Sequence, residues 1–112
     1  MDALEMTLLY DYYGELLTQR QRLCFDLYYN QDLSLSEIAQ ELQVSRQGVY
    51  DNLSRAEALL RNMEEKTGCI RRDLKARKAV QNILAVAAKL CADPATAEIG
   101  QTIMEACKDL EE

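Results

Sequence analysis

The segment 34–55, SLSEIAQELQVSRQGVYDNLSR, constrains the fold more than any other part of the chain. Ser34 and Glu37 have the spacing of a capping box, in which each side chain binds the other residue's backbone N–H and so starts a helix. Apolar residues recur at helical spacing on both sides of a three-residue turn at 43–45. Ala39 supplies the small residue that two steeply packed helices need where they cross. This pattern predicts a helix-turn-helix, whose second helix can enter the major groove of DNA.

Details of this motif predict where its helices begin and end. Gln43 stands where the turn often carries glycine, so the required backbone has a modest cost in free energy. Ser45 is a good N-cap, because its oxygen can accept from backbone N–H groups of the following turn. The second helix is expected to run for about 20 residues, or about 30 Å, and to stop at Gly68. The residues expected to face inward are Ile38, Ala39 and Leu42 in the first helix and Val49, Leu53, Ala56, Leu60 and Met63 in the second.

Composition favours an all-α chain. The 112 residues are 48% apolar and 29% charged, which fits a globular protein with its own core. The chain has only one Pro and four Gly, the residues that form tight turns, and a many-stranded fold would need more of them. We therefore predict an all-α helical bundle that contains the helix-turn-helix, has no wing, and carries additional C-terminal helices.

Two helices are predicted before the motif and two after it. A capping box at 18–21 opens the second helix, a fifth is expected from about Asp73, and Asp93-Pro94 predicts the cap and first turn of the last. The buried faces are expected to comprise Leu4, Leu8, Leu9, Tyr12 and Leu16; then Leu23, Cys24, Leu27 and Tyr28; and finally Ile99, Ile103, Ala106 and Leu110.

The composition turns basic near 67–72, which predicts a boundary there. Residues 1–67 would form an N-terminal domain with the helix-turn-helix at about 34–54. Residues 68–112 would form a helical extension that packs on this domain or makes a homodimer. The long fourth helix and the two apolar-striped helices after it are the basis for the dimer.

The sequence contains no constellation for catalysis or metal binding. It has no histidine, and its four cysteines include no closely spaced pair. It also lacks a glycine-rich phosphate loop and a nucleophile elbow. No stretch approaches the roughly 20 apolar residues of a membrane span, and acidic Asp2 and Glu5 stand where a signal peptide would be basic. We predict a cytoplasmic protein with reduced thiols that is not an enzyme and has no cofactor, metal or membrane span.

Charge limits where nucleic acid could bind. The net charge is −6, so any contact must be local. On the outer face of the second motif helix, arginine can pair with guanine and glutamine with adenine, while tyrosine can reach a phosphate or stack on a base. Asp51 on the same face would repel phosphate, and a merely solvated face remains the alternative. The candidate residues there are Ser45, Arg46, Gln47, Tyr50 and Arg55.

The segment 68–92 carries six basic residues and one acidic residue, and holds the only dense cationic run of the sequence. Its basic residues could grip a phosphate backbone by charge. Leu74 and Ala76 interrupt the run at helical spacing, which favours a solvated helix face instead. The residues of this possible phosphate patch are Arg71, Arg72, Lys75, Arg77 and Lys78.

Residues 10–66 resemble the YlxM family of small bacterial helix-turn-helix proteins. The blocks that carry the resemblance are 16–21, 27–29, 34–39 and 44–52. Residues 16–60 also resemble the fourth region of bacterial sigma factors, which reads promoter −35 elements, so the expected bundle is sigma region 4-like. The YlxM resemblance implies a cytoplasmic regulatory protein encoded beside genes of the signal recognition particle, and it brings no catalytic residues.

These observations together predict a non-enzymatic regulator in the signal recognition particle pathway. Its expected partners are nucleic acid, with DNA favoured over RNA, and components of the particle. Two alternatives stay open. One is a protein–protein adaptor of the targeting pathway that does not read bases, and the other is a sigma-like transcription regulator.

Overall fold

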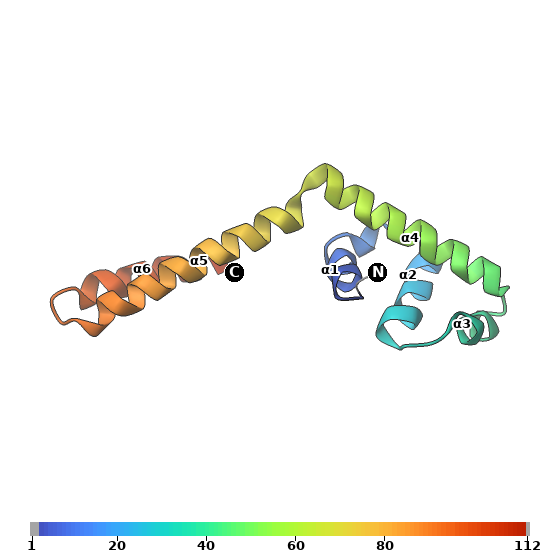
Figure 1. Cartoon of the computed structure of the whole chain (residues 1–112), viewed down its shortest axis with the longest axis horizontal. Helices are drawn as coiled ribbons and strands as arrows, with labels where there is room; N and C mark the ends of the chain where they lie inside the picture. The colour runs from blue at the N-terminus through green and yellow to red at the C-terminus, as the bar shows by residue number, and fades with distance from the viewer. Residues whose placement is uncertain (1–2, 112) are drawn as a thin grey trace. The chain divides into compact units, whose positions relative to one another are not determined.

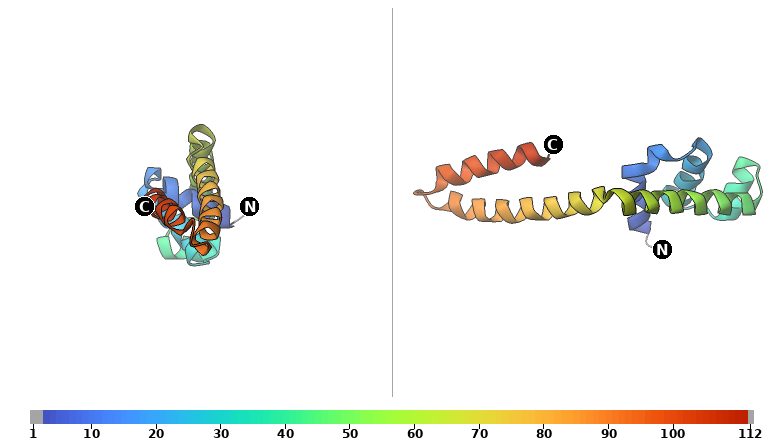
Figure 2. Two further views of the ribbon diagram at one scale, coloured as in Figure 1. Left: turned by 90° about the vertical axis from the view of Figure 1, so that its left-hand side faces the viewer. Right: turned by 90° about the horizontal axis from the view of Figure 1, so that it is seen from above.

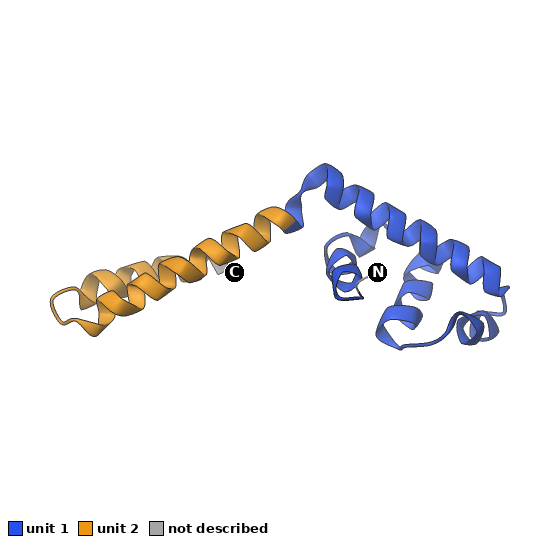
Figure 3. Ribbon diagram, viewed as in Figure 1, with its two compact units in different colours: residues 1–70 blue, residues 71–112 orange. Residues whose placement is uncertain are grey.

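The structure is a computed structural model that describes residues 3–111 (Figure 1). Every regular element in this range is helical, which confirms the all-α prediction. The α-helices are α1 (Ala3–Tyr13), α2 (Gln19–Phe25), α3 (Leu35–Leu42), α4 (Arg46–Thr67), α5 (Cys69–Ala92) and α6 (Ala97–Glu111). A 3₁₀ turn, η1 (Gly14–Leu16), follows α1, and a π-helical turn, η2 (Asp26–Asn30), follows α2. The chain divides into two compact units, residues 1–70 and 71–112 (Figure 3).

Both predicted capping boxes are present. The hydroxyl of Thr18 accepts from the backbone N–H of Gln21 at 3.1 Å, and the Gln21 side chain accepts from the N–H of Thr18 at 3.0 Å. Ser34 and Glu37 make the same reciprocal pair at 3.1 and 3.0 Å. Because each box satisfies two backbone donors that the helix itself leaves unpaired, the starts of α2 and α3 are determined locally.

The turn between α3 and α4 also forms as predicted. Gln43 adopts the left-handed conformation, with φ 57° and ψ 45°, and ends α3. Ser45 caps α4, because its Oγ accepts from the backbone N–H of Gly48 at 2.9 Å. Gly68 ends α4 with φ 64°. Left-handed backbone is expensive for a residue with a Cβ, so Gln43 is a strained position and Gly68 is not.

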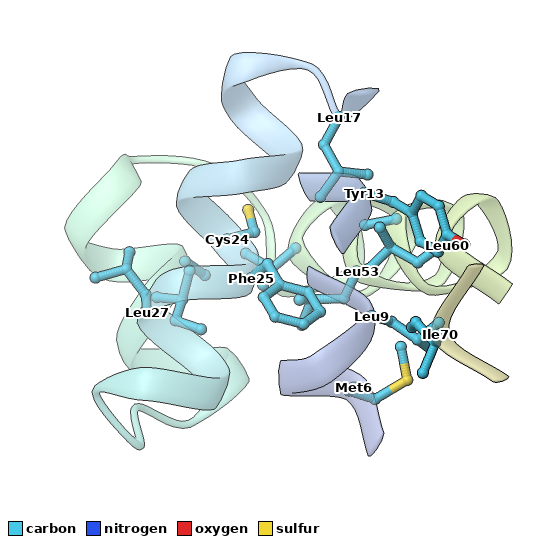
Figure 4. Packing of buried hydrophobic residues seen from close by; sticks show 14 residues of the cluster. Met6, Leu9, Tyr13, Leu17, Cys24, Phe25, Leu27, Leu53, Leu60 and Ile70 are labelled. Carbon is cyan, nitrogen blue, oxygen red and sulfur yellow. The ribbon is translucent and has the colours of Figure 1, made fainter. Parts of the chain in front are cut away.

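One apolar core holds the first unit together, and α4 is its central element. This helix packs against α1, α2 and α3, and four of its five predicted inward residues are buried while Met63 packs beside them half-buried. Phe25 is fully buried at the centre of the core (Figure 4). Its ring stacks on Tyr10 with centroids 4.6 Å apart and contacts Tyr29 at 4.5 Å.

The prediction of the buried face was partly wrong for α1. Leu9 is buried as predicted, and Leu8 and Tyr12 pack half-buried against the core. Leu4 and Leu16, however, are 78% and 54% exposed, and Met6 and Tyr13 are buried in their place. The 3₁₀ turn after Tyr13 breaks the helical register, so a stripe drawn through position 16 does not follow one face.

The prediction for the second helix was partly wrong. Cys24 and Leu27 are buried, but Leu23 and Tyr28 are 41% and 38% exposed and Phe25 takes the central place in the core. The π-helical turn of η2 has more residues per turn than an α-helix, so a spacing of 3.6 residues cannot be carried across it.

The start of α5 lies earlier than predicted, at Cys69 instead of about Asp73. The carboxylate of Glu64 accepts from the backbone N–H of Ile70 at 3.0 Å, so a side chain from α4 caps the new helix. The hydroxyl of Tyr13 donates to the same Oε1 at 2.7 Å. This three-way contact joins α1, α4 and the first turn of α5 within the first unit.

The start of α6 lies later than predicted. Pro94 belongs to a turn, and the helix begins at Ala97. The carboxylate of Asp93 accepts from the N–H of Ala95 at 3.0 Å, and the hydroxyl of Thr96 donates to the carbonyl of Leu90 at 2.7 Å. Asp93 therefore closes the turn between the helices and does not cap α6.

In the second unit, α5 and α6 extend to the same side of this turn as an antiparallel pair and diverge with distance from it (Figure 2). Gly100 lies where they approach, and a Cβ built on it would be 2.8 Å from the carbonyl oxygen of Ala87. Ala87 and Cys107 are the buried apolar side chains of this unit, while Ile99 and Leu110 on the predicted stripe are 58% and 71% exposed.

The four cysteines are free thiols; Cys24 and Cys107 are buried and the other two are half-buried. Burial raises the pKa of the Cys24 thiol. None of the helices described is long and apolar enough to cross a membrane.

Candidate nucleic-acid interface

The first turns of α4 present a polar face to solvent. Val49 and Leu53 are buried beneath this face and hold the helix on the core. The exposed side chains of this face are those of Arg46, Gln47, Tyr50, Asp51, Ser54 and Arg55. The capped N-terminus and the buried stripe together place these side chains on a rigid element, as base reading requires.

Some predicted contact residues of this face already form hydrogen bonds within the protein, and others do not. Arg46 and Arg55 are exposed, and Tyr50 is 54% exposed. Ser45 is exposed too, but its hydroxyl caps α4. Gln47 donates from Nε2 to the carboxylate of Asp51 at 3.0 Å. Arg46 and Tyr50 are therefore the best candidates for direct contact, whereas Gln47 must leave Asp51 before its amide can pair with adenine.

Asp51 has a different partner from the one expected. The i, i+4 spacing predicts a surface pair with Arg55, but Asp51 accepts a hydrogen bond from Gln47. This carboxylate lies among the candidate contact residues, where its negative charge would repel phosphate.

The residues of the possible phosphate patch lie on the first turns of α5, and all five are exposed. They belong to the second compact unit, while the candidate contacts on α4 belong to the first. Residues 71–78 hold one acidic side chain, Asp73, among the five basic ones. The structure keeps this run on a helix, so its charges alternate with Leu74 and Ala76 around the helix surface.

The fold creates a groove beside Tyr50 that sequence reasoning did not predict. The groove has a volume of about 610 Å³ and lies between η2, the segment 31–37 and α4. Its lining includes Tyr28, Asp32 and Glu37 together with Tyr50 and Glu57 of α4. These residues come from three separate segments, so sequence spacing cannot bring them together. The sequence predicts Tyr28 as a core residue and Tyr50 as a nucleic-acid contact, and it does not place the two side by side.

Two hydrogen bonds join lining residues of this groove in pairs. The hydroxyl of Tyr29 donates to Oε1 of Glu57 at 2.7 Å, and burial together with this bond raises the pKa of Tyr29. The backbone N–H of Ser34 donates to the carboxylate of Glu37, which lowers the pKa of Glu37 and keeps it ionised. Within the part of the chain that the structure covers, no cluster of three or more His, Cys, Asp or Glu side chains could hold a metal ion.

Two helices that meet across a left-handed three-residue turn, with the second helix capped and exposed at its start, define a helix-turn-helix protein. Residues 1–94 match the model of the UPF0122 family, described as "Putative helix-turn-helix protein, YlxM / p13 like". The chain belongs to this family, which confirms the resemblance found in the sequence.

Individual relatives agree with this assignment. A UPF0122 protein of Halalkalibacterium halodurans is 41% identical over 109 residues, which cover 97% of this chain and 96% of the relative. One of Caldanaerobacter subterraneus is 51% identical over 82 residues, 73% of this chain and 70% of the relative. One of Thermoanaerobacter sp. (strain X514) is 58% identical over 71 residues, 63% of this chain, and there the match spans 61% of the relative's length.

Proposed function

We propose that this protein is a non-enzymatic regulator that binds nucleic acid, DNA in preference to RNA, through the first turns of α4. One observation carries the proposal: Arg46 and Tyr50 stand exposed at the capped N-terminal end of a helix whose opposite side is buried. In helix-turn-helix proteins this end of the second helix contacts base edges in the major groove.

The chemistry assigns each side chain a distinct role. The guanidinium of Arg46 can pair with O6 and N7 of a guanine, which supplies sequence discrimination. The hydroxyl of Tyr50 and the guanidinium of Arg55 reach phosphate, which positions the helix without reading sequence. Gln47 can read adenine once its amide releases Asp51. Ser45 contributes indirectly by capping the helix.

Binding should be local and modest in affinity. The chain carries a net charge of −6, and Asp51 lies within the contact face. Few phosphates can then be neutralised, so the dependence of the binding constant on salt should be shallow. This expectation distinguishes base reading by one helix from a broad electrostatic coating.

The regulatory role that we propose lies in the signal recognition particle pathway. Its support is the YlxM resemblance together with the family membership reported above. The second candidate function is a protein–protein adaptor of the same pathway that does not read bases. The acidic and aromatic groove beside Tyr50 favours this alternative, because such a surface repels phosphate and suits a protein partner. A sigma-like transcription regulator would further require contact with RNA polymerase.

Fluorescence anisotropy tests the proposal with two probes, DNA from upstream of the protein's own operon and the signal recognition particle RNA. Arg46→Ala should weaken DNA binding by about tenfold, the loss expected for one bidentate base contact. Arg20→Ala is the matched control, because Arg20 is also exposed and lies in the first turn of α2. It should leave DNA binding unchanged.

A second variant separates the two candidate surfaces. Neutralising Lys75, Arg77 and Lys78 together removes half of the basic residues of the segment 68–92. Saturable RNA binding that is lost only in this variant would transfer the function to the phosphate patch on α5. Absence of binding to both probes at low salt would overturn nucleic-acid binding and leave the adaptor as the function.

A further inference from the structure

The groove beside Tyr50 combines aromatic surface with negative charge. Tyr28 and Tyr50 are 38% and 54% exposed along it, and the carboxylates of Asp32, Glu37 and Glu57 line it with them. None of its lining residues that the structure describes is basic. A surface of this kind suits an apolar side chain flanked by ammonium groups, because tyrosine faces and carboxylates both attract cations.

Hydrogen bonds hold two of the three carboxylates of the groove in place. Glu37 completes the capping box of α3, and the backbone hydrogen bond there keeps it ionised. Glu57 accepts from Tyr29. The third, Asp32, is exposed and has φ 57°, a conformation that aspartate and asparagine tolerate better than most residues.

A complementary surface lies on α5 of the same sequence. Leu74 is 49% exposed, although it is a large apolar residue, and Lys75 and Lys78 are exposed beside it. At 3.6 residues per turn these three side chains lie on the side of α5 away from Ala87, the residue that is buried in the second unit. This Leu–Lys–Lys face is therefore not the one that α5 turns toward α6.

We propose that the groove receives the Leu74–Lys75–Lys78 face of α5 from a second copy of the chain. Leu74 packs against the rings of Tyr28 and Tyr50, and the two ammonium groups approach the carboxylates that line the groove. The occupant is chosen by charge complementarity, since the segment 68–92 holds the dense cationic run of the sequence. The contact joins two different surfaces, so each copy offers both a groove and a helix face.

Self-association would regulate DNA binding because Tyr50 belongs to both surfaces. A copy docked in the groove covers Tyr50 and withholds it from DNA, so DNA should shift the protein toward the monomer. This consequence rests on the function proposed above, whereas the contact between copies does not.

Isosteric changes can remove the charge of the groove without removing its structure. In the groove variant, Asp32→Asn keeps a residue that tolerates the left-handed backbone, Glu37→Gln keeps the capping box, and Glu57→Gln keeps an acceptor for Tyr29. The matched control changes three exposed carboxylates that do not line the groove, in Asp11→Asn/Glu41→Gln/Glu65→Gln. Both variants gain the same three units of charge.

The experiment is sedimentation equilibrium of the full-length chain over a range of concentrations at low and high salt. The groove variant, and separately Lys75→Gln/Lys78→Gln, should each weaken self-association by about tenfold or more. The control should behave as wild type, and high salt should weaken the wild type. An equimolar mixture of the groove and lysine variants should regain association, because one copy keeps the helix face and the other keeps the groove.

Three outcomes would overturn the inference. The first is a wild-type monomer at all concentrations. The second is association that neither variant weakens. The third is a mixture that fails to regain association, which would indicate contact between like surfaces. Anisotropy with the DNA probe is recorded on the same samples, so loss of the proposed contact and loss of DNA binding are observed independently.

Discussion

Both units of this protein have sequences with amphipathic helical spacing, but the units differ greatly in how many side chains they bury. In the first unit, fourteen side chains form one buried cluster around Phe25 and α4. In the second unit, the buried apolar side chains are Ala87 and Cys107. Amphipathic spacing is present in both, so the spacing indicates which residues can form a helix and does not indicate how much partner surface covers them.

The number of helices packed together explains why the first unit buries more side chains than the second. The first unit packs α1, α2 and α3 against α4, so residues on several faces find neighbours. The second unit has two helices that approach at Gly100 and then separate (Figure 2). Ile83 and Ile99 therefore remain 45% and 58% exposed despite their helical spacing. Two helices cannot enclose a core as four elements can.

The largest expected effect is on the core of the first unit. Phe25→Ala should lower the free energy of unfolding by about 3–5 kcal/mol, because it leaves a cavity and removes the ring contacts with Tyr10 and Tyr29. Ile83→Ala in the second unit should lower it by less than about 1 kcal/mol, since half of that side chain is already in water.

Urea denaturation followed by two probes distinguishes the units in these variants. All six tyrosines lie in the first unit and the chain has no tryptophan, so tyrosine fluorescence reports that unit alone. Far-ultraviolet circular dichroism reports the helices of both units. Equal losses of stability in Phe25→Ala and Ile83→Ala would break the contrast between the units.

The next effect concerns the approach of α5 and α6. Gly100→Ala should destabilise the second unit by about 1–3 kcal/mol, because the new Cβ would lie 2.7 Å from Sγ of Cys91 and 2.8 Å from the carbonyl oxygen of Ala87. Gly48→Ala is the control: its Cβ would meet only Oγ of Ser45, at 3.1 Å, and alanine favours the helix.

Hydrogen exchange of the backbone amides measures this prediction. In Gly100→Ala, faster exchange should be confined to α5 and α6, while the tyrosine transition keeps its midpoint. Gly48→Ala should exchange as the wild type does or more slowly. Unchanged exchange in Gly100→Ala would mean that the two helices do not depend on their close approach.

A smaller gain of stability is expected in the turn of the helix-turn-helix. Gln43→Gly should stabilise the first unit by about 1 kcal/mol, because glycine adopts φ 57° without the strain of a Cβ. Gln40→Gly, at an exposed position inside α3, should destabilise it by about the same amount. Replacing glutamine by glycine should therefore raise the stability of the first unit at position 43 and lower it at position 40. The urea midpoint of tyrosine fluorescence checks both changes.

The smallest effect is a pH dependence that separates the two capping boxes. The pKa of Glu37 is lowered in the folded state, first by the backbone N–H of Ser34. Its stabilising contribution is therefore complete above the ordinary glutamate pKa of about 4.3 and is lost as the pH falls through the folded value. The other box uses Gln21, which carries no charge and makes no such contribution.

Glu37→Gln should give the first unit a shallower loss of stability in acid than the wild type shows. Urea midpoints of tyrosine fluorescence, measured from about pH 6 down to about pH 3, test this difference. Identical slopes in the two proteins would show that the capping carboxylate of α3 does not contribute through its ionised form.

Much of the fold could be predicted because its signals are local. Both capping boxes and the Ser45 cap depend on side chains within four residues of the backbone groups that they serve, and the Gly68 stop depends on the backbone conformation of that one residue. The stripe from Val49 to Leu60 was predictable for the same reason, since α4 is regular from end to end. The stripe also predicted which polar residues lie on the outer face of α4, among them the candidate contacts Arg46 and Tyr50.

The remaining features depend on residues far apart in the chain. The sequence by itself determined where α2, α3 and α4 begin and where α3 and α4 end, because a helix satisfies its hydrogen bonds within a few residues. Only the tertiary structure decided that Met6 and Phe25 enter the core while Leu4 and Leu16 stay in water. It also decided that Tyr28 and Tyr50 share one groove, since burial and grooves arise from the packing of whole elements, which no local spacing encodes.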